Sequence, residues 1–331
     1  GRALMAEPVL NSDFDVPDLL RESRILVCCG AGGVGKTTSA AALGLLAAQL
    51  GRRVCVMTID PARRLAQAMG LSELADEPQL VEVPVGALSA MMLNPKHTFD
   101  RMVESYAPDA RVRDSIFANR YYQELSSTLG GSRELIAMER VLEIASSDEF
   151  DLLIVDTPPS QHALDFLDGP KRLIGMLDGS FVQMLLAPYG IAARTQFNLF
   201  QHSSAVVLKF LERLTGVGMM ADLSEFLLAF SSMFAGLKER SHRVMALMGE
   251  PSTHFVLVCA PQPPSLRQVL RFASRLDDDK LNIGGVLVNR VHADFGSEEL
   301  SAADIQWLDS DHQDSAAVAS LSVRLDAALQ D

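Results

Sequence analysis

Short apolar stretches, each bounded by Gly or charged residues, recur along the chain and predict buried β-strands. The first, RILVCC at 24–29, is too short for a helix and ends at Gly30. An Ala- and Leu-rich segment over 36–50 follows and closes at Gly51, which predicts a helix with a glycine at its C-terminal end. RRVCVMTID at 52–60 predicts a second strand, so this part forms a right-handed parallel unit. Further strands are predicted at 88–93, 151–156, 254–260 and 283–289.

Two long tracts between these strands predict helices rather than short crossovers. We therefore expect an α/β protein with a mostly parallel sheet flanked by helices and an inserted helical subdomain, contributed by about 96–147 and 164–248. Residues 23–331 are expected to form one domain of this kind behind an N-terminal arm, 1–22. The residues GRAL before Met5 are expected to be a cloning remnant.

The second helical tract is rich in Met, Phe and Leu, and two interpretations stay open. These side chains either fill the interior of the helical subdomain or line an exposed apolar groove for a hydrophobic client helix, since flexible Met side chains adapt to varied partners. The members are Met176, Phe181, Met184, Leu185, Phe197, Phe200, Phe210, Met219, Met220, Phe226, Phe230, Met233 and Phe234.

Composition narrows the classes of partner. The formal charge of −13, from 29 basic and 42 acidic residues, argues against nucleic-acid binding, so an anionic ligand needs a local binding device. Uncharged segments such as 179–193 are shorter than the roughly 20 residues that span a bilayer. The four cysteines fall in apolar strands without a C-x-x-C pair, which predicts buried, reduced thiols and a cytoplasmic location.

The segment GAGGVGKT at 30–37 supplies such a device, because it fits G-x-x-x-x-G-K-[ST] between a predicted strand and a predicted helix. Glycines let backbone N–H groups turn towards phosphate oxygens, and the helix N-terminus adds partial positive charge. Lys36 is expected to reach the β and γ phosphates and Thr37 to bind Mg²⁺. A plain Gly-rich turn would leave Lys36 unexplained. The predicted nucleotide-binding residues are Gly30, Gly32, Gly33, Val34, Gly35, Lys36, Thr37 and Thr38.

Two aspartates at strand ends are candidates for the chemistry around the phosphates. Asp156 ends the strand 151–156, where it either caps a turn or lies beside the metal; the phosphate loop favours the metal-side role. Asp60 ends the strand 52–60. It either caps a helix starting at Pro61 or orients the attacking water and accepts its proton.

Four segments in this order resemble the ArsA/guided-entry ATPases, which belong to the deviant Walker A class. They are GAGGVGKTT at 30–38, IDPARRLAQAMG at 59–70, VDTPPSQHALDFLDGPKRL at 155–173 and VNR at 288–290. That family includes the arsenite-pump ATPase and the cytosolic ATPase that carries tail-anchored membrane proteins. The resemblance implies Mg²⁺-dependent ATP hydrolysis by a cytoplasmic dimer.

By position, the resemblance also implies roles for individual residues. Asp60 would orient the hydrolytic water in switch I, and Asp156 would face hydrated Mg²⁺ in switch II. Asn289 would recognise adenine, with Pro261 bordering the base. Switch segments that become ordered around a γ-phosphate are a common means of turning hydrolysis into movement.

One loop position departs from the family pattern. Family loops read GKGGVGKT, and their first Lys crosses a dimer interface to the partner's phosphates, whereas this chain has Ala31. A cation supplied in trans can be worth roughly 10³–10⁵ in rate. Three consequences stay open: a paralogous partner that supplies the Lys, which we favour, slow hydrolysis by this chain alone, or nucleotide binding without turnover.

Three classes of function therefore remain. The first is a targeting or chaperone ATPase for hydrophobic or membrane-protein clients, the second an energising subunit of an export system, and the third a partitioning or regulatory switch. The long helical tracts favour the first class. The metalloid-binding cysteines of the arsenite pump and the zinc-binding C-x-x-C of the guided-entry dimer have no counterpart here, and Arg63 stands where the family usually has His.

Overall fold

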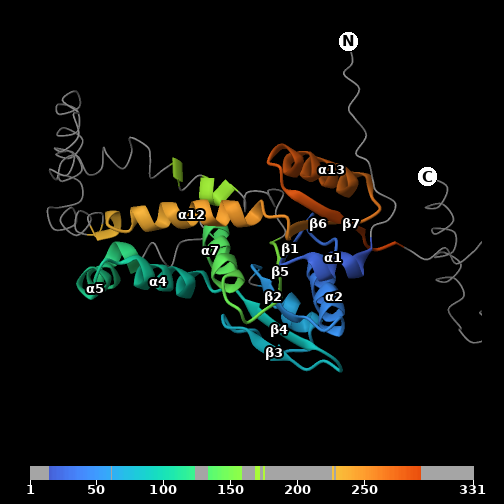
Figure 1. Ribbon diagram of the computed structural model, residues 1–331, viewed down its shortest axis with the longest axis horizontal. Helices are drawn as coiled ribbons and strands as arrows, with labels where there is room; N and C mark the ends of the chain where they lie inside the picture. Colours follow the sequence, from blue (N-terminus) through green and yellow to red (C-terminus); the bar gives the residue numbers. More distant parts are fainter. Residues whose placement is uncertain are drawn as a thin grey trace, which may run out of the picture. The chain divides into compact units, whose positions relative to one another are not determined.

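The computed structural model describes residues 15–60, 62–123, 133–158, 168–171, 174–175, 226 and 229–291. The chain divides into a unit of Gly1–Arg290 and a unit of Val291–Asp331, and Val291 alone is described in the second. The first unit contains a seven-stranded sheet with the order β3-β4-β2-β5-β1-β6-β7 (Figure 1). The strands are β1 Ile25–Gly30, β2 Arg53–Thr58, β3 Gln79–Val81, β4 Ala87–Met92, β5 Leu152–Asp156, β6 Thr253–Cys259 and β7 Asn282–Val288.

The predicted mostly parallel sheet is confirmed. Six of its strands lie within one or two residues of the predicted stretches, and all of them run parallel. The sequence did not reveal β3, which pairs antiparallel with β4 at the edge of the sheet. Three residues, QLV, are too few to show an alternating pattern, so pairing with β4 decides their conformation.

Helices cover both faces of the sheet and enclose two separate apolar cores. α2 packs on β1, β2, β4 and β5, with α1 and α3 against it; α7 packs on β5 and α13 on β6 and β7 over the other face. The described helices are α1 Val16–Glu22, α2 Lys36–Gln49, α3 Arg64–Ala68, α4 Pro95–Tyr106, α5 Ala110–Ala118, α7 Arg133–Ala145, α12 Phe234–Met248 and α13 Pro263–Asp278.

The end of α2 confirms the role predicted for Gly51. Its φ of 88° lies in the left-handed region that glycine adopts without strain. The Gly51 N–H donates to the Ala48 carbonyl at 2.9 Å and the Arg52 N–H to the Ala47 carbonyl at 3.2 Å, which is the Schellman pattern. These two hydrogen bonds end the helix and direct the chain into β2.

The helical tracts are confirmed where they are described. α4, α5 and α7 occupy the first tract, and α7 contacts both α4 and α12. Four members of the Met- and Phe-rich set are described: Phe226 and Met233 are buried, and Phe230 and Phe234 pack against the same core. For these four the interior interpretation holds; the other members lie outside the described residues.

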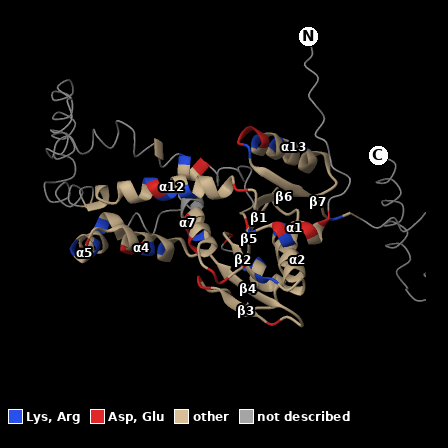
Figure 2. Cartoon of the chain, in the orientation of Figure 1, with Lys and Arg blue, Asp and Glu red and all other residues tan. Residues whose placement is uncertain are grey.

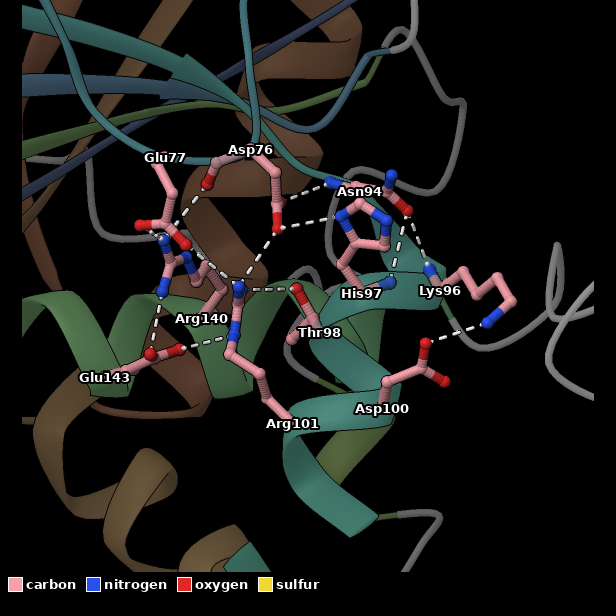
Figure 3. A network of polar contacts seen from close by, with 10 residues as sticks. All are labelled: Asp76, Glu77, Asn94, Lys96, His97, Thr98, Asp100, Arg101, Arg140 and Glu143. Atoms are coloured by element: carbon pink, nitrogen blue, oxygen red, sulfur yellow. Dashed lines mark hydrogen bonds and ion pairs between the residues drawn. The ribbon is translucent and has the colours of Figure 1, made fainter. Parts of the chain in front are cut away.

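A network of ion pairs ties the loop between α3 and β3 to the helices α4 and α7 (Figure 3). Arg140 of α7 is buried and donates to Glu77 at 2.8 Å and to the Asp76 carbonyl at 3.0 Å, while Glu143 pairs with it at 2.8 Å. Arg101 of α4 donates to the Asp76 carboxylate at 3.1 Å. Two guanidinium groups thus hold one loop against two helices.

Charged residues of both signs lie on the helices, as α1 and α12 show in Figure 2. Arg21 and Asp18 of α1, for example, form an exposed pair at 2.7 Å. Among the described residues, no helix combines the length and the apolar character that a membrane span requires.

Burial predicts different costs for the loss of two arginines whose ion pairs have similar lengths, 2.8 Å for Arg140 and 2.7 Å for Arg21. Arg140→Ala should lower the free energy of unfolding by about 2–3 kcal/mol, because it removes a buried guanidinium and leaves its several acceptors without this donor. Arg21→Ala, which removes an exposed pair, should change it by less than about 0.5 kcal/mol. Urea unfolding measures both variants, and equal losses would contradict the role given to the network.

Candidate functional site

The predicted phosphate loop lies at the carboxyl end of β1, where the strand order of the sheet reverses. β1 sits between β5 and β6, and the chain leaves β1 through α2 to reach β2 beyond β5. In open parallel sheets, ligands bind outside the carboxyl ends of the strands at such a reversal. The topology of the sheet therefore by itself favours a ligand-binding site at the position of the loop.

Glycines set the conformation of the loop. Gly33 and Gly35 have φ values of 76° and 95°, both in the left-handed region, and Gly35 is the N-cap of α2. A Cβ on Gly30 would lie 2.1 Å from the Val258 carbonyl oxygen of β6. Gly32 and Thr38 are exposed, whereas Val34 is buried. Glycine is thus required by backbone conformation at Gly33 and by close contact at Gly30, and the N-terminus of α2 follows the loop.

Lys36 lies across this loop. Its Nζ donates to the Ala31 carbonyl at 2.9 Å, and the side chain is only 5% exposed. Burial lowers the pKa of Lys36, and the nearby Asp156 carboxylate opposes that shift. An ammonium group that already lies over the loop can turn to a phosphate without a large rearrangement.

Asp156 lies beneath the loop and is completely buried. Its Oδ2 accepts hydrogen bonds from the Thr37 hydroxyl at 2.8 Å and from the Thr58 hydroxyl at 2.9 Å. Burial raises the pKa of Asp156, while both hydroxyls and the charge of Lys36 lower it. Three strand and helix ends, those of β2, β5 and α2, therefore meet at one carboxylate.

The second oxygen of Asp156 identifies a place for a cation. Within the described residues, Oδ1 is buried and has no hydrogen-bond partner, and an unpaired buried carboxylate oxygen is costly. Mg²⁺ prefers oxygen ligands and keeps several of its waters. The Thr37 hydroxyl and Asp156 therefore fit hydrated Mg²⁺, with Thr37 as a ligand and Asp156 as an acceptor for the bound waters.

The structure corrects one interpretation of Asp60. The helix does not start at Pro61, because α3 begins at Arg64 with Arg63 as its N-cap, and Pro61 itself lies outside the described residues. Asp60 instead closes a turn before the helix, with Oδ1 accepting from the Ala62 N–H at 3.0 Å. A proline favours the first helical position, but the side chain of Asp60 satisfies the backbone before a helix can form.

The other oxygen of Asp60 is also engaged. Arg64 donates to Oδ2 at 3.1 Å, one helical turn further along the chain, and the side chain of Asp60 is 14% exposed. The Asp60 N–H donates to the Thr58 hydroxyl at 3.2 Å, and the same hydroxyl binds Asp156. Thr58 thus connects the two candidate carboxylates through a single side chain.

The two residues expected near the base lie at the same edge of the sheet. Asn289 follows β7, and its Nδ2 donates to the Val34 carbonyl of the loop at 2.9 Å. Pro261 is exposed in the bend between β6 and α13. The structure therefore brings Asn289 to the loop, and Pro261 lies three residues beyond Val258, the residue that pairs with Gly30. Of the segment that the resemblance assigns to switch II, residues 159–167 lie outside the described residues.

Sequence reasoning missed Thr58 and Arg64. Thr58 could have been found, because it ends a strand next to the one that ends in Asp156, and the carboxyl ends of parallel strands share one edge. Arg64 is visible in the PARR segment, four residues after Asp60, which is the spacing at which helical side chains meet.

The four cysteines are buried and free, as predicted. Burial raises the pKa of Cys29 and of Cys55 to about 12. Thiols with such pKa values stay protonated at neutral pH, and only thiolates are good ligands for soft ions. These cysteines are core residues rather than part of the site.

Comparisons with known proteins agree with the geometry. A family model described as an anion-transporting ATPase, ArsA_ATPase, matches residues 23–309. The protein named ATPase get3 from Neurospora crassa is 26% identical over 285 residues, which cover 86% of this chain and 77% of that relative. ATPase get3 from Aspergillus terreus is 28% identical over 296 residues, covering 87% and 77%. ATPase ASNA1 homolog 2 from Paramecium tetraurelia is 24% identical over 293 residues, covering 86% and 80%.

The raised pKa of Asp156 predicts an unusual effect of pH on stability. A carboxyl whose pKa is higher in the folded state stabilises the fold below its unfolded value, about 4, and this contribution is lost as the pH rises through the folded value. Asp156→Asn should therefore melt about 2–4 °C above the unsubstituted chain at pH 7, without nucleotide or Mg²⁺. The difference should shrink towards pH 4.

Asp151, at the start of the same strand, is the matched control. Hydrogen bonds from Arg53 lower the pKa of Asp151, so its contribution to stability is present at pH 7 and is lost as the pH falls. Asp151→Asn should therefore destabilise the protein at pH 7 and have less effect in acid. Thermal unfolding across a pH series tests both variants; equal signs at pH 7 would contradict the account of Asp156.

Proposed function

The chain belongs to the ArsA family of anion-transporting ATPases, and on that premise we propose that it is a nucleotide-driven dimer switch that acts on hydrophobic or membrane-protein clients. The observation that carries the nucleotide part is the group of contacts around Asp156. A buried carboxylate with one unpaired oxygen lies beside the Thr37 hydroxyl and beneath a glycine loop crossed by Lys36. These are the groups that a triphosphate with a hydrated divalent cation requires.

Each residue of the site has a separate task in hydrolysis. The loop N–H groups and Lys36 bind the phosphates and stabilise the negative charge that develops on them. Thr37 and Asp156 would hold Mg²⁺, and the ion, when bound, would neutralise part of the negative charge of the phosphates. Asp60 orients the attacking water and accepts its proton. Each oxygen of Asp60 has one protein partner here, and a carboxylate oxygen has two acceptor positions, so Asp60 can bind the water while both contacts stay in place.

The small side chain at position 31 supports dependence on a partner. The Ala31 carbonyl accepts a hydrogen bond from the Nζ of Lys36, and the Ala31 side chain brings no second cation to the loop. The chain therefore forms either a homodimer with slow turnover or a heterodimer in which a paralogue supplies the missing Lys. Charge stabilisation from a partner's side chain can raise the rate by orders of magnitude.

The proposal for clients draws on the family and not on the described Met and Phe residues. The relatives that match most of the chain carry the names ATPase get3 and ATPase ASNA1 homolog. The family that the sequence resembles includes carriers of tail-anchored membrane proteins. The described residues of the Met- and Phe-rich set, Phe226, Phe230, Met233 and Phe234, belong to the core. Export of a metalloid bound by thiolates is disfavoured, because all four thiols are buried.

Asp60→Asn should separate nucleotide binding from turnover. The variant keeps the size of the side chain but removes the proton acceptor. It should therefore bind MgATP with unchanged affinity and hydrolyse it at least about 10²-fold more slowly. With ATP it should stay dimeric by light scattering and keep a transmembrane peptide in solution, whereas with ADP it should do neither. Unchanged steady-state hydrolysis would remove Asp60 from the mechanism.

Ala31→Lys tests the missing cation. If the chain pairs with itself, the added ammonium should raise turnover by about tenfold or more at protein concentrations that favour the dimer. Ala31→Gln, which has a long side chain without charge, is the matched control and should leave the rate unchanged. A rate and a dimerisation constant that are the same for Lys and Ala at position 31 would contradict a trans-acting cation.

A further inference from the structure

We propose that Asn289 is a latch that holds the phosphate loop in its binding conformation, whether or not a base is present. This inference rests on the proposed function, since it assigns a second task to a residue of the same site. Asn289 and Val34 are separated by 255 positions in the sequence, yet the Asn289 Nδ2 donates to the Val34 carbonyl at 2.9 Å. A residue that only recognises a base would not need this contact.

The contact fixes the direction of one peptide group in the loop. The C=O and N–H groups of a trans peptide point in opposite directions, and the described part of the chain contains no cis peptide. When Asn289 holds the Val34 carbonyl on its own side, the N–H of Gly35 must point away from Asn289. Gly35 is the N-cap of α2, so its N–H is one of the groups that a helix N-terminus offers to an anion.

The side chain of Asn289 lies so close to the loop that a Cβ at position 35 would displace its amide group. A Cβ added to Gly35 would lie 2.1 Å from the Asn289 Nδ2. The left-handed φ of 95° already favours glycine at position 35, and the approach of Asn289 gives a second, independent reason. The loop and the side chain of Asn289 are therefore packed directly against each other.

The backbone that carries Asn289 is held firmly. The Asn289 N–H donates to the Cys259 carbonyl of β6 at 2.7 Å. The next residue, Arg290, has a left-handed φ of 59°, which is uncommon for a residue with a side chain and persists only when its surroundings impose it. The same strand β6 packs against the other end of the loop, where Val258 leaves no room for a Cβ on Gly30. Both ends of the loop are thus anchored on the β6–β7 side of the sheet.

The hydrogen bond to the loop does not prevent Asn289 from recognising the base. An amide nitrogen carries two hydrogens, and only one of them is used by Val34, while the amide oxygen is a separate acceptor. The remaining groups can bind adenine. One side chain would then join the base to the phosphate loop, so that each favours the ordered form of the other.

Binding of a triphosphate without a base distinguishes the latch from a base reader. The test is isothermal titration calorimetry of the full chain with inorganic tripolyphosphate and with ATP, each in the presence of Mg²⁺. Asn289→Leu, which keeps a branched side chain but has neither the donor nor the acceptor of the amide, should weaken binding of both ligands by about tenfold, the effect of one lost hydrogen bond that orders the loop. Asn289→Ala should do the same.

Asn282, at the opposite end of β7, is the matched control. Its Nδ2 also donates to backbone carbonyls, those of Glu250 at 2.8 Å and Thr253 at 3.2 Å, but it lies far from the loop along the strand. Asn282→Leu should leave the affinity for tripolyphosphate unchanged even if it lowers the melting temperature. This comparison separates loss of the latch from general destabilisation.

The outcomes are distinct. Loss of affinity for ATP alone in the Asn289 variants, with tripolyphosphate binding intact, would overturn the latch and leave Asn289 as a base reader. An equal loss with Asn282→Leu would also overturn it, because the effect would then be one of stability. Failure of the unsubstituted chain to bind either ligand would overturn the proposed function, and the latch with it.

Discussion

The site depends on one carboxylate that the fold removes completely from water. Asp156 ends β5 in the middle of the sheet, where it has two hydroxyl donors and one ammonium group nearby but also an oxygen without a partner. A buried carboxylate in this state destabilises the folded protein at neutral pH. A positively charged ligand would remove that cost. The arrangement therefore suits a cation-binding site, whereas without a cation it only lowers the stability of the fold.

The same carboxylate connects the two halves of the candidate mechanism. Thr37 comes from the first turn of the helix behind the phosphate loop, and Thr58 comes from the strand that leads to Asp60. A change in the charge near Asp156 is therefore felt both at the loop and at Asp60, because each hydroxyl has only one hydrogen to donate. Beyond Asp60 the chain continues through α3 to Asp76 and Glu77, where Arg101 and Arg140 hold it to α4 and α7 (Figure 3).

The loop itself has little freedom. Strand β6 limits it at Gly30, and the side chain of Asn289 limits it at Val34 and Gly35. A binding loop that is ordered before its ligand arrives loses less entropy on binding. The position of Lys36 over the Ala31 carbonyl fits this picture, since the ammonium group already lies at the loop. Within the loop, the departure from the family pattern is therefore confined to the side chain at position 31, where Ala replaces Lys.

The sequence by itself determined the strands and most of the candidate site. Six strands, the helix after the loop and the Gly51 end of that helix followed from apolar runs and glycine positions, because these signals are local, although β7, predicted as buried, has Ile283, Val286 and Val288 exposed at the edge of the sheet. The spacing of GAGGVGKT located the phosphate loop for the same reason. The tertiary structure alone decided the antiparallel edge strand β3, the start of α3 at Arg64, the link through Thr58 and the contact between Asn289 and Val34. These depend on residues that lie far apart in the chain or on a side chain that competes with helix formation, and no local pattern encodes such contacts.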